Sequence, residues 1–155
     1  MGELLMKQKA LSIRESYEVY NGDELKYIMQ RRKLLASKPA YDIYIEDGVV
    51  ATAEVTSTAA PVIYKIAFNG EDAGEVRFDE IPGVNKLVYE EKGIEVDSNS
   101  ILSEFTIKDK DKKIIGTIKK KLVSMKDTYD IKFENDSDEL LFVMLGLLVD
   151  ETFHG

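Results

Sequence analysis

The sequence predicts a mainly β protein, a closed antiparallel barrel of about twelve strands that is built from repeated hairpins and encloses an apolar C-terminal α-helix. Three observations carry this prediction. Runs that alternate apolar and polar residues recur along the chain, tight-turn pairs separate them, and an acidic stretch near the end opens a run that is apolar on every side. With 155 residues, 44% of them apolar and 32% charged, we expect one domain over residues 1–155.

An internal repeat predicts the strands. Three segments align without gaps and share an opening of a basic residue, a polar residue and Lys, and a close of Tyr, an acid and an aliphatic residue. They are Lys7–Val19, Arg31–Ile43 and Lys119–Ile131. The runs at 41–45 and 129–133 alternate large apolar and polar residues for most of their length, as half-buried strands do. We infer one supersecondary unit used several times.

The turns identify that unit as a hairpin. Asn21-Gly22, Asp47-Gly48 and Asn69-Gly70 each follow an alternating run and precede another apolar run, and such pairs favour the positive φ of a type I′ turn. Lys92-Gly93 and residues 109–111 occupy similar places. The next such pair, Asn135-Asp136, leads instead into the final helix.

The final helix opens on Asp136, Ser137, Asp138 and Glu139, which can cap free N–H groups and complement the helix dipole. We prefer capping to calcium binding because these acids lack the alternating spacing and central Gly of an EF-hand loop. The run from Leu140 to Val149 is apolar all round but only about half as long as the ~20 residues of a membrane span. A closed barrel around this helix would bury it and leave no exposed strand edge.

The chain resembles the LURP-one-related family, within the Tubby C-terminal-like superfamily that also holds the phospholipid scramblases. The resemblance covers nearly the whole chain. It is carried by Met6-Lys7-Gln8-Lys9 with Leu11-Ser12, the Tyr-acid-aliphatic strands, the strand at 115–121 and the acidic opening of the apolar helix. It implies a twelve-stranded barrel around a central C-terminal helix. It implies no activity, although Tubby domains of that superfamily bind phosphoinositide head groups.

Basic residues of the repeats are the candidate anion-binding residues: Lys7, Lys9, Arg31, Arg32, Lys33, Lys119, Lys120 and Lys121. Because residues two apart share one face of a strand, Lys7 with Lys9, Arg31 with Lys33, and Lys119 with Lys121 each form a step of two charges. Neighbouring steps on the barrel would hold an anion such as a lipid head group. The alternative is that these side chains only solubilise the strands and block mispairing.

Other chemistry finds little support. The chain has no Cys and one His, His154, so we expect no cysteine nucleophile, no disulfide and no metal site. We expect the protein to be cytoplasmic, with at most a peripheral association with a membrane. We expect no catalytic residue and no cofactor. Tyr17, Tyr41 and Tyr129 recur at repeat positions, which indicates a packing layer whose hydroxyls reach a rim. The net charge of −8 disfavours nucleic acid as a partner, and we expect a monomer.

The sequence therefore predicts a non-enzymatic binding or scaffold module, with an anionic phospholipid head group as its most concrete ligand. The alternative is a protein-interaction module with no lipid role, in which a strand surface or the segment at residues 81–84 receives the partner. An enzyme is disfavoured because the helix would fill the interior where a substrate would otherwise bind.

Overall fold

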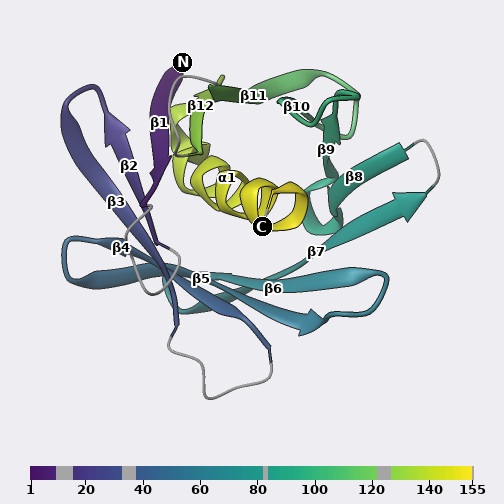
Figure 1. Cartoon of the computed structure of the whole chain (residues 1–155), viewed down its shortest axis with the longest axis horizontal. Helices are drawn as coiled ribbons and strands as arrows, with labels where there is room; N and C mark the ends of the chain where they lie inside the picture. The colour runs from purple at the N-terminus through teal and green to yellow at the C-terminus, as the bar shows by residue number, and fades with distance from the viewer. Residues whose placement is uncertain (10–15, 33–37, 82–83, 122–126, 155) are drawn as a thin grey trace.

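The chain forms a closed barrel of twelve antiparallel strands around one helix, which confirms the predicted fold class (Figure 1). This is a computed structural model, and it describes residues 1–9, 16–32, 38–81, 84–121 and 127–154. The strands are β1 (Gly2–Gln8), β2 (Ser16–Asn21), β3 (Glu24–Arg31), β4 (Ala40–Ile45), β5 (Gly48–Ser57), β6 (Val62–Phe68), β7 (Glu71–Ile81), β8 (Val84–Tyr89), β9 (Ile94–Ser98), β10 (Glu104–Lys108), β11 (Ile114–Lys121) and β12 (Thr128–Phe133). Each strand pairs with its neighbours in sequence, and β1 pairs with β12 to close the ring.

The hairpin turns correct the prediction in detail. Only Asn69-Gly70 has positive φ at both central positions, 52° and 80°, as a type I′ turn requires. In the other two hairpins the turn residues are Gly22-Asp23 and Glu46-Asp47, one residue away from the predicted pairs. A register shift lies in each of these hairpins, between Val19 and Tyr20 and between Ile43 and Tyr44. The Asn69-Gly70 hairpin also contains a register shift, between Ile66 and Ala67, so a bulge does not by itself decide where the turn lies.

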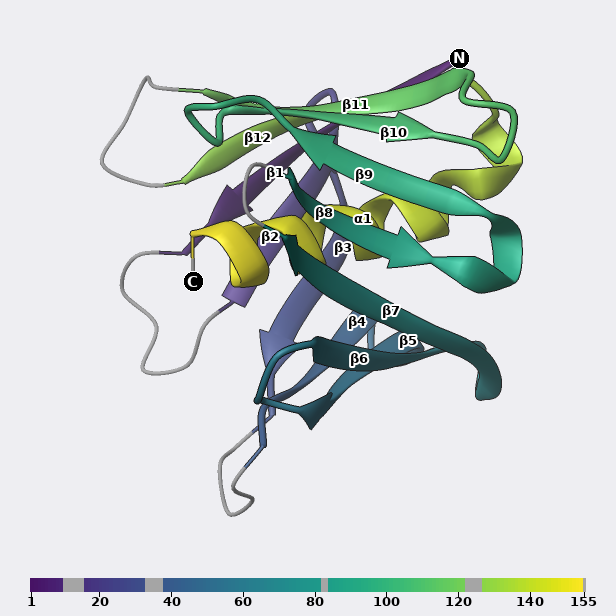
Figure 2. The same ribbon diagram turned by 90° about the vertical axis from the view of Figure 1, so that its right-hand side faces the viewer.

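The helix α1 (Glu139–Phe153) runs through the barrel and is preceded by a 3₁₀ turn, η2 (Asp136–Asp138) (Figure 2). All ten residues from 141 to 150 are buried, so the prediction of a helix surrounded by protein is confirmed. The capping prediction is wrong in detail. The Asn135 side chain accepts from the Ser137 N–H, whereas Asp138 at the N-cap of α1 makes no side-chain cap bond.

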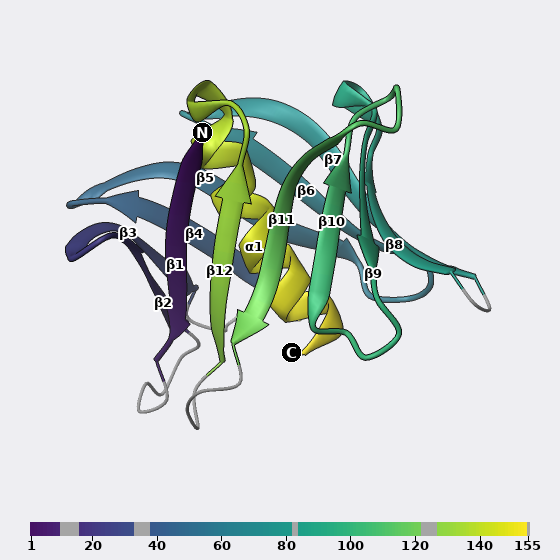
Figure 3. The same cartoon turned by 90° about the horizontal axis from the view of Figure 1, so that it is seen from above.

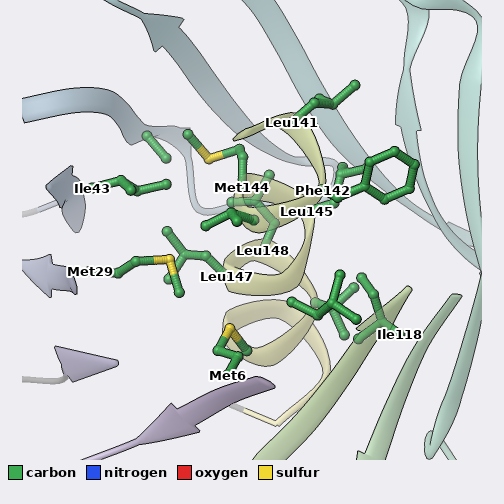
Figure 4. Close-up of a cluster of buried hydrophobic side chains, with 14 of the residues drawn as sticks. Met6, Met29, Ile43, Ile118, Leu141, Phe142, Met144, Leu145, Leu147 and Leu148 are labelled. Carbon is green, nitrogen blue, oxygen red and sulfur yellow. The ribbon is translucent and has the colours of Figure 1, made fainter. Parts of the chain in front are cut away.

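The core forms where the helix meets the inward side chains of the strands. Four fully buried side chains of the barrel wall surround the buried leucines of α1 (Figure 4). They are Met6, Met29, Ile43 and Ile118. Along strands such as β1 and β3 the buried residues alternate with more exposed ones, so one side of these strands faces the helix. The barrel interior is therefore filled by side chains.

Two glycines let the helix approach the wall. A Cβ at Gly146 would lie 2.8 Å from Ile131 Cδ1 and 3.4 Å from Met6 Sδ, so this bare position of α1 sits against β12 and β1. A Cβ at Gly116 would lie 2.3 Å from Phe142 Cε1 and 2.7 Å from the Lys132 carbonyl oxygen. The second position has less room to adjust because one of its neighbours is backbone.

Replacing Gly116 by Ala is accordingly expected to lower the free energy of unfolding by about 1–3 kcal/mol, the usual cost of overpacking a core. Urea unfolding followed by circular dichroism measures this change. Gly48→Ala is the matched control. A Cβ at Gly48 would lie 3.7 Å from its nearest neighbour, the Ile45 carbonyl oxygen, and the φ of Gly48 is not positive. Equal stability of the two variants would show that Phe142 does not pack as described.

Among the described residues, no helix is both long enough and apolar enough to cross a membrane.

Candidate functional site

The basic residues of the repeats divide between the two sides of the barrel wall. Paired residues on neighbouring strands point to the same side of a sheet. Lys120 pairs with the buried Tyr129, and Arg31 pairs with the buried Tyr41, so both basic side chains point inward at the rim. Lys7 and Lys121 both pair with Thr128, on the opposite side from Tyr129, and point outward.

The outward lysines gather on three neighbouring strands, where β1 and β11 flank β12 (Figure 3). We call this surface the lysine face. Its members are the exposed Lys7, Lys9, Lys119, Lys121 and Lys132. On the outer sides of the same three strands the carboxylates are Glu3 and Asp130. A protein with a net charge of −8 thus carries a locally basic surface.

Ion pairing differs among these lysines. Lys9 lies 3.4 Å from Glu18 of β2, and the Lys7 ammonium lies 5.2 Å from the centre of the Tyr20 ring. Lys119 and Lys121 form no ion pair with any described residue. Neighbouring strands are about 4.8 Å apart, so Lys7 and Lys121 start about 10 Å from each other across β12. Two flexible lysine side chains can reach one phosphate-sized anion from that separation.

The remaining predicted residues are placed elsewhere. Arg32 is separated from the lysine face by β2 and β3. Its guanidinium lies 2.8 Å from Asp42 of β4 and 3.1 Å from Glu54 of β5. The hydrogen bonds that the guanidinium donates to these carboxylates raise the pKa of Arg32, and the bond to Asp42 has the largest effect. Lys33 lies outside the described residues. The structure therefore brings together the steps Lys7 with Lys9 and Lys119 with Lys121, and separates Arg31, Arg32 and Lys120 from them.

A second cluster forms inside the barrel at the C-terminal end of α1, where tyrosine hydroxyls converge on helix side chains. Tyr17 and Tyr129 each donate to Asp150, at 2.5 Å. Tyr17 and Tyr41 each lie 2.6 Å from a different oxygen of Glu151. The Tyr64 hydroxyl lies 2.8 Å from Thr152 Oγ1. We call these four tyrosines and their helix partners the tyrosine ring: Tyr17, Tyr41, Tyr64 and Tyr129 with Asp150, Glu151 and Thr152. The prediction that the repeated tyrosines form a packing layer is confirmed, but the Tyr17 and Tyr129 hydroxyls end on the buried Asp150 inside the barrel and not at a rim.

Burial controls the electrostatics of this cluster. Asp150 is 1% exposed, and desolvation raises its pKa, while the hydrogen bonds from Tyr129 and Tyr17 oppose that rise. Burial also raises the pKa of Tyr17 and of Tyr129, and the neighbouring carboxylates raise both further. The phenols therefore stay protonated and act as donors. Carboxylates at a helix C-terminus meet the negative end of its dipole, so these donors compensate an unfavourable position.

His154 closes the helix beside this cluster. Its Nε2 lies 2.6 Å from the Leu102 carbonyl oxygen and its Nδ1 lies 3.4 Å from Lys120 Nζ. A neutral ring that donates from Nε2 and accepts at Nδ1 satisfies both contacts. Lys120 also lies 3.0 Å from Asp127. The inward basic group is thus part of a local polar network at the rim.

The residues that sequence reasoning missed are Lys132 on the lysine face and the pair Asp150 and Glu151. The alternation Asp130, Ile131, Lys132 carried the signal for Lys132, because Asp130 and Lys132 share the outer side. The signal for the pair was the recurrence of tyrosines that each need a buried hydrogen-bond partner. The helix has two acids at this end, Asp150 and Glu151, whereas Glu139 at its other end accepts from the Tyr27 hydroxyl at 2.5 Å.

The class of protein that these features define is a closed antiparallel barrel threaded by its own C-terminal helix. Comparisons with protein-family models, with curated proteins and with solved structures find no match for this chain.

Proposed function

We propose that the protein is a non-enzymatic binding module whose lysine face binds the anionic head groups of a phospholipid surface. One observation carries the proposal: Lys7, Lys119 and Lys121 project from strands on either side of β12, exposed, and none of them forms an ion pair with a described residue. The resemblance to the Tubby C-terminal-like superfamily points in the same direction. The alternative ligand is a protein partner with no lipid role.

The physical basis of the proposal is additive charge. Each Lys held near an anionic membrane contributes about 1 kcal/mol of binding free energy, and this attraction falls off within a Debye length. The net charge of the whole molecule opposes approach at long range. The proposal therefore requires that the lysine face meets the surface first, with the acidic remainder turned away.

Vesicle flotation tests this proposal. We expect the protein to float with vesicles of phosphatidylcholine that contain phosphatidylserine or a phosphoinositide, and not with phosphatidylcholine alone, and to bind more weakly at physiological than at low salt. The double variant Lys119→Gln and Lys121→Gln loses two unpaired charges. Its affinity should fall by about 30-fold, which corresponds to about 2 kcal/mol.

The matched control removes two other exposed lysines, Lys65→Gln and Lys92→Gln. Lys65 lies on β6, diametrically opposite β12 in the ring, and Lys92 lies in η1 (Glu90–Lys92) between β8 and β9. Both double variants have the same net charge, so only the lysine face distinguishes them. Equal losses in the two variants, or no flotation with any vesicle, would overturn the proposal and favour the protein-partner alternative.

A further inference from the structure

The barrel wall opens between the β2–β3 hairpin and the β4–β5 hairpin. The ladder between β3 and β4 begins only at the pair Ile28 and Tyr44, so residues 24–27 of β3 have no partner on β4. Ile45, the next residue of β4, pairs with Gly48 of β5 instead. Figure 1 shows the tips of the two hairpins diverging. The ring of strands is closed, but it keeps a short exposed strand edge at this place.

A cleft of about 320 Å³ occupies the opening. Its apolar lining comes from Leu25 and Ile45, which are 42% and 40% exposed, and from Ile28. Val49 of β5, which is 49% exposed, lies one strand further and pairs with Tyr44. Leu25, Ile45 and Val49 are three of the six exposed large apolar side chains among the described residues. Exposed apolar surface that gathers in one place marks an interaction site.

The first turn of α1 lies behind the cleft and neutralises its basic lining residue. The Tyr27 hydroxyl donates to Glu139 of α1 at 2.5 Å, and the Lys26 ammonium lies 2.6 Å from the same carboxylate oxygen. Tyr27 and Lys26 both line the cleft. The positive charge of Lys26 is therefore balanced by the helix and does not repel a cationic ligand.

The rim of the cleft is acidic. Glu24 and Glu46 line it, and Asp23 and Asp47, which follow or precede them in the two turns, are exposed as well. None of these four carboxylates forms an ion pair within the part of the chain that the structure describes. Such a rim attracts a ligand that carries positive charge and repels an acidic one.

An exposed strand edge beside an apolar hollow suits an extended peptide. In strand addition the main chain of the peptide forms hydrogen bonds with the edge, and its alternate side chains enter pockets beside it. The acidic rim adds a requirement for basic residues on either side of the apolar one. A surface of anionic lipid does not meet this requirement, because it would approach the carboxylates with charge of the same sign.

We propose that this cleft binds an extended segment of a partner protein, in which Lys or Arg residues flank an apolar centre. The segment pairs with residues 24–27 of β3, places an apolar side chain against Leu25 and Ile45, and turns its basic residues to the carboxylates of the rim. The inference is independent of the proposed function, because the cleft and the lysine face share no residue and attract ligands of opposite charge.

The test is a titration of the full chain with the peptide Lys-Lys-Val-Ile-Val-Lys-Lys, followed by the fluorescence anisotropy of a label on the peptide and by the methyl NMR signals of Leu25 and Ile45. We expect saturable binding and shifts of both methyl signals. The absence of saturable binding up to about 1 mM peptide, the weak end of the range for specific complexes, would overturn the proposal. So would saturable binding that leaves both signals unchanged.

Three comparison peptides each remove one property of the first. Glu replaces every Lys in one peptide, and Ser-Asn-Ser replaces the apolar centre in another. The third carries N-methyl groups on Ile and on the Val that follows it, so one amide on the paired edge is blocked in either register. We expect each of the three to bind at least about tenfold more weakly, equivalent to about 1.4 kcal/mol. Equal binding of any one of them would overturn the proposal.

Variants of the protein locate the site. The double variant Glu24→Gln and Glu46→Gln should weaken binding of the first peptide by about two- to tenfold, as expected for two exposed ion pairs. The matched control, Glu71→Gln and Glu80→Gln, removes two exposed carboxylates from β7 and should leave binding unchanged.

Leu25→Ser changes an exposed side chain, so the variant should stay folded by circular dichroism while peptide binding weakens several-fold. Equal losses in the two double variants, or unchanged binding in Leu25→Ser, would overturn the assignment of this cleft.

Discussion

A chain that ends at Glu139 is expected to lose cooperative unfolding altogether. The residues removed include all ten buried positions of α1, from Leu141 to Asp150, on which the inward side chains of every wall segment pack. A barrel of this width without its helix would have to hold water against apolar walls or collapse. We expect a molten or insoluble chain that binds hydrophobic dyes and shows no sharp thermal transition.

Point variants of the intact helix control for the size of that deletion. Leu145 is 0% exposed and Leu140 is half-buried at the first turn. Leu145→Ala should therefore cost about 2–5 kcal/mol of unfolding free energy and Leu140→Ala distinctly less. A sharp urea transition of the shortened chain, or equal losses in the two point variants, would contradict the enclosed helix.

The second large effect concerns Asp150 in the tyrosine ring. Tyr17 and Tyr129 are its described side-chain donors, and the carboxylate is 1% exposed. In a chain with Tyr17→Phe and Tyr129→Phe the carboxylate stays buried without these donors, so the free energy of unfolding at neutral pH should fall by about 3–5 kcal/mol. Adding Asp150→Leu to the same chain removes the charge and should restore most of that loss. Urea unfolding measures both steps.

The pH dependence of the double variant has a defined sign. Burial already raises the pKa of Asp150, and the two phenol hydrogen bonds lower it, so their removal raises it further. The folded variant then binds a proton more tightly than the unfolded chain, where the pKa is about 3.9. Its stability should rise as the pH falls from neutral towards that value. If the loss of unfolding free energy in the double variant did not change with pH, Asp150 would have to be solvated.

The control for these substitutions is the pair Tyr20→Phe and Tyr44→Phe. Both tyrosines are half-buried on the outer side of the wall, and Tyr20 donates only to Glu18, at 3.1 Å, in contact with solvent. Surface substitutions of this kind usually change stability by less than about 0.5 kcal/mol. A similar loss in this pair would show that the phenol hydroxyls matter generally, and not through the buried carboxylate.

Much of the fold could be predicted from the sequence because its signals are local. Alternation with a period of two marks several of the strands, and an all-apolar run such as Leu140–Val149 must be surrounded by other parts of the protein if it does not span a membrane. The turn positions at Gly22-Asp23 and Glu46-Asp47 were not predictable from the dipeptides alone, because the register of a hairpin is set by pairing across its two strands.

The candidate sites were less predictable because the side of the barrel wall to which a side chain points depends on tertiary structure. Lys119, Lys120 and Lys121 read as one basic run, yet the middle residue points inward with Tyr129 and the other two point outward. A shift of one residue in register would exchange them, and nothing in the run itself fixes that register. Glu151 likewise reads as the polar end of an apolar helix until three strands, β4, β5 and β6, place tyrosines and valines around it.

The pairing of β1 with β12 has a consequence for the order in which the protein can acquire its structure during synthesis. The strand that closes the ring and the helix that fills it both lie beyond residue 127, so residues 1–121 leave the ribosome with their apolar sides uncovered. At roughly 5–20 residues per second, the stretch from Thr128 to Phe153 takes about 1–5 s to synthesise. Over that interval the eleven earlier strands lack the helix that covers their apolar sides and the strand that closes their two edges, which are the features that favour aggregation of a folding intermediate.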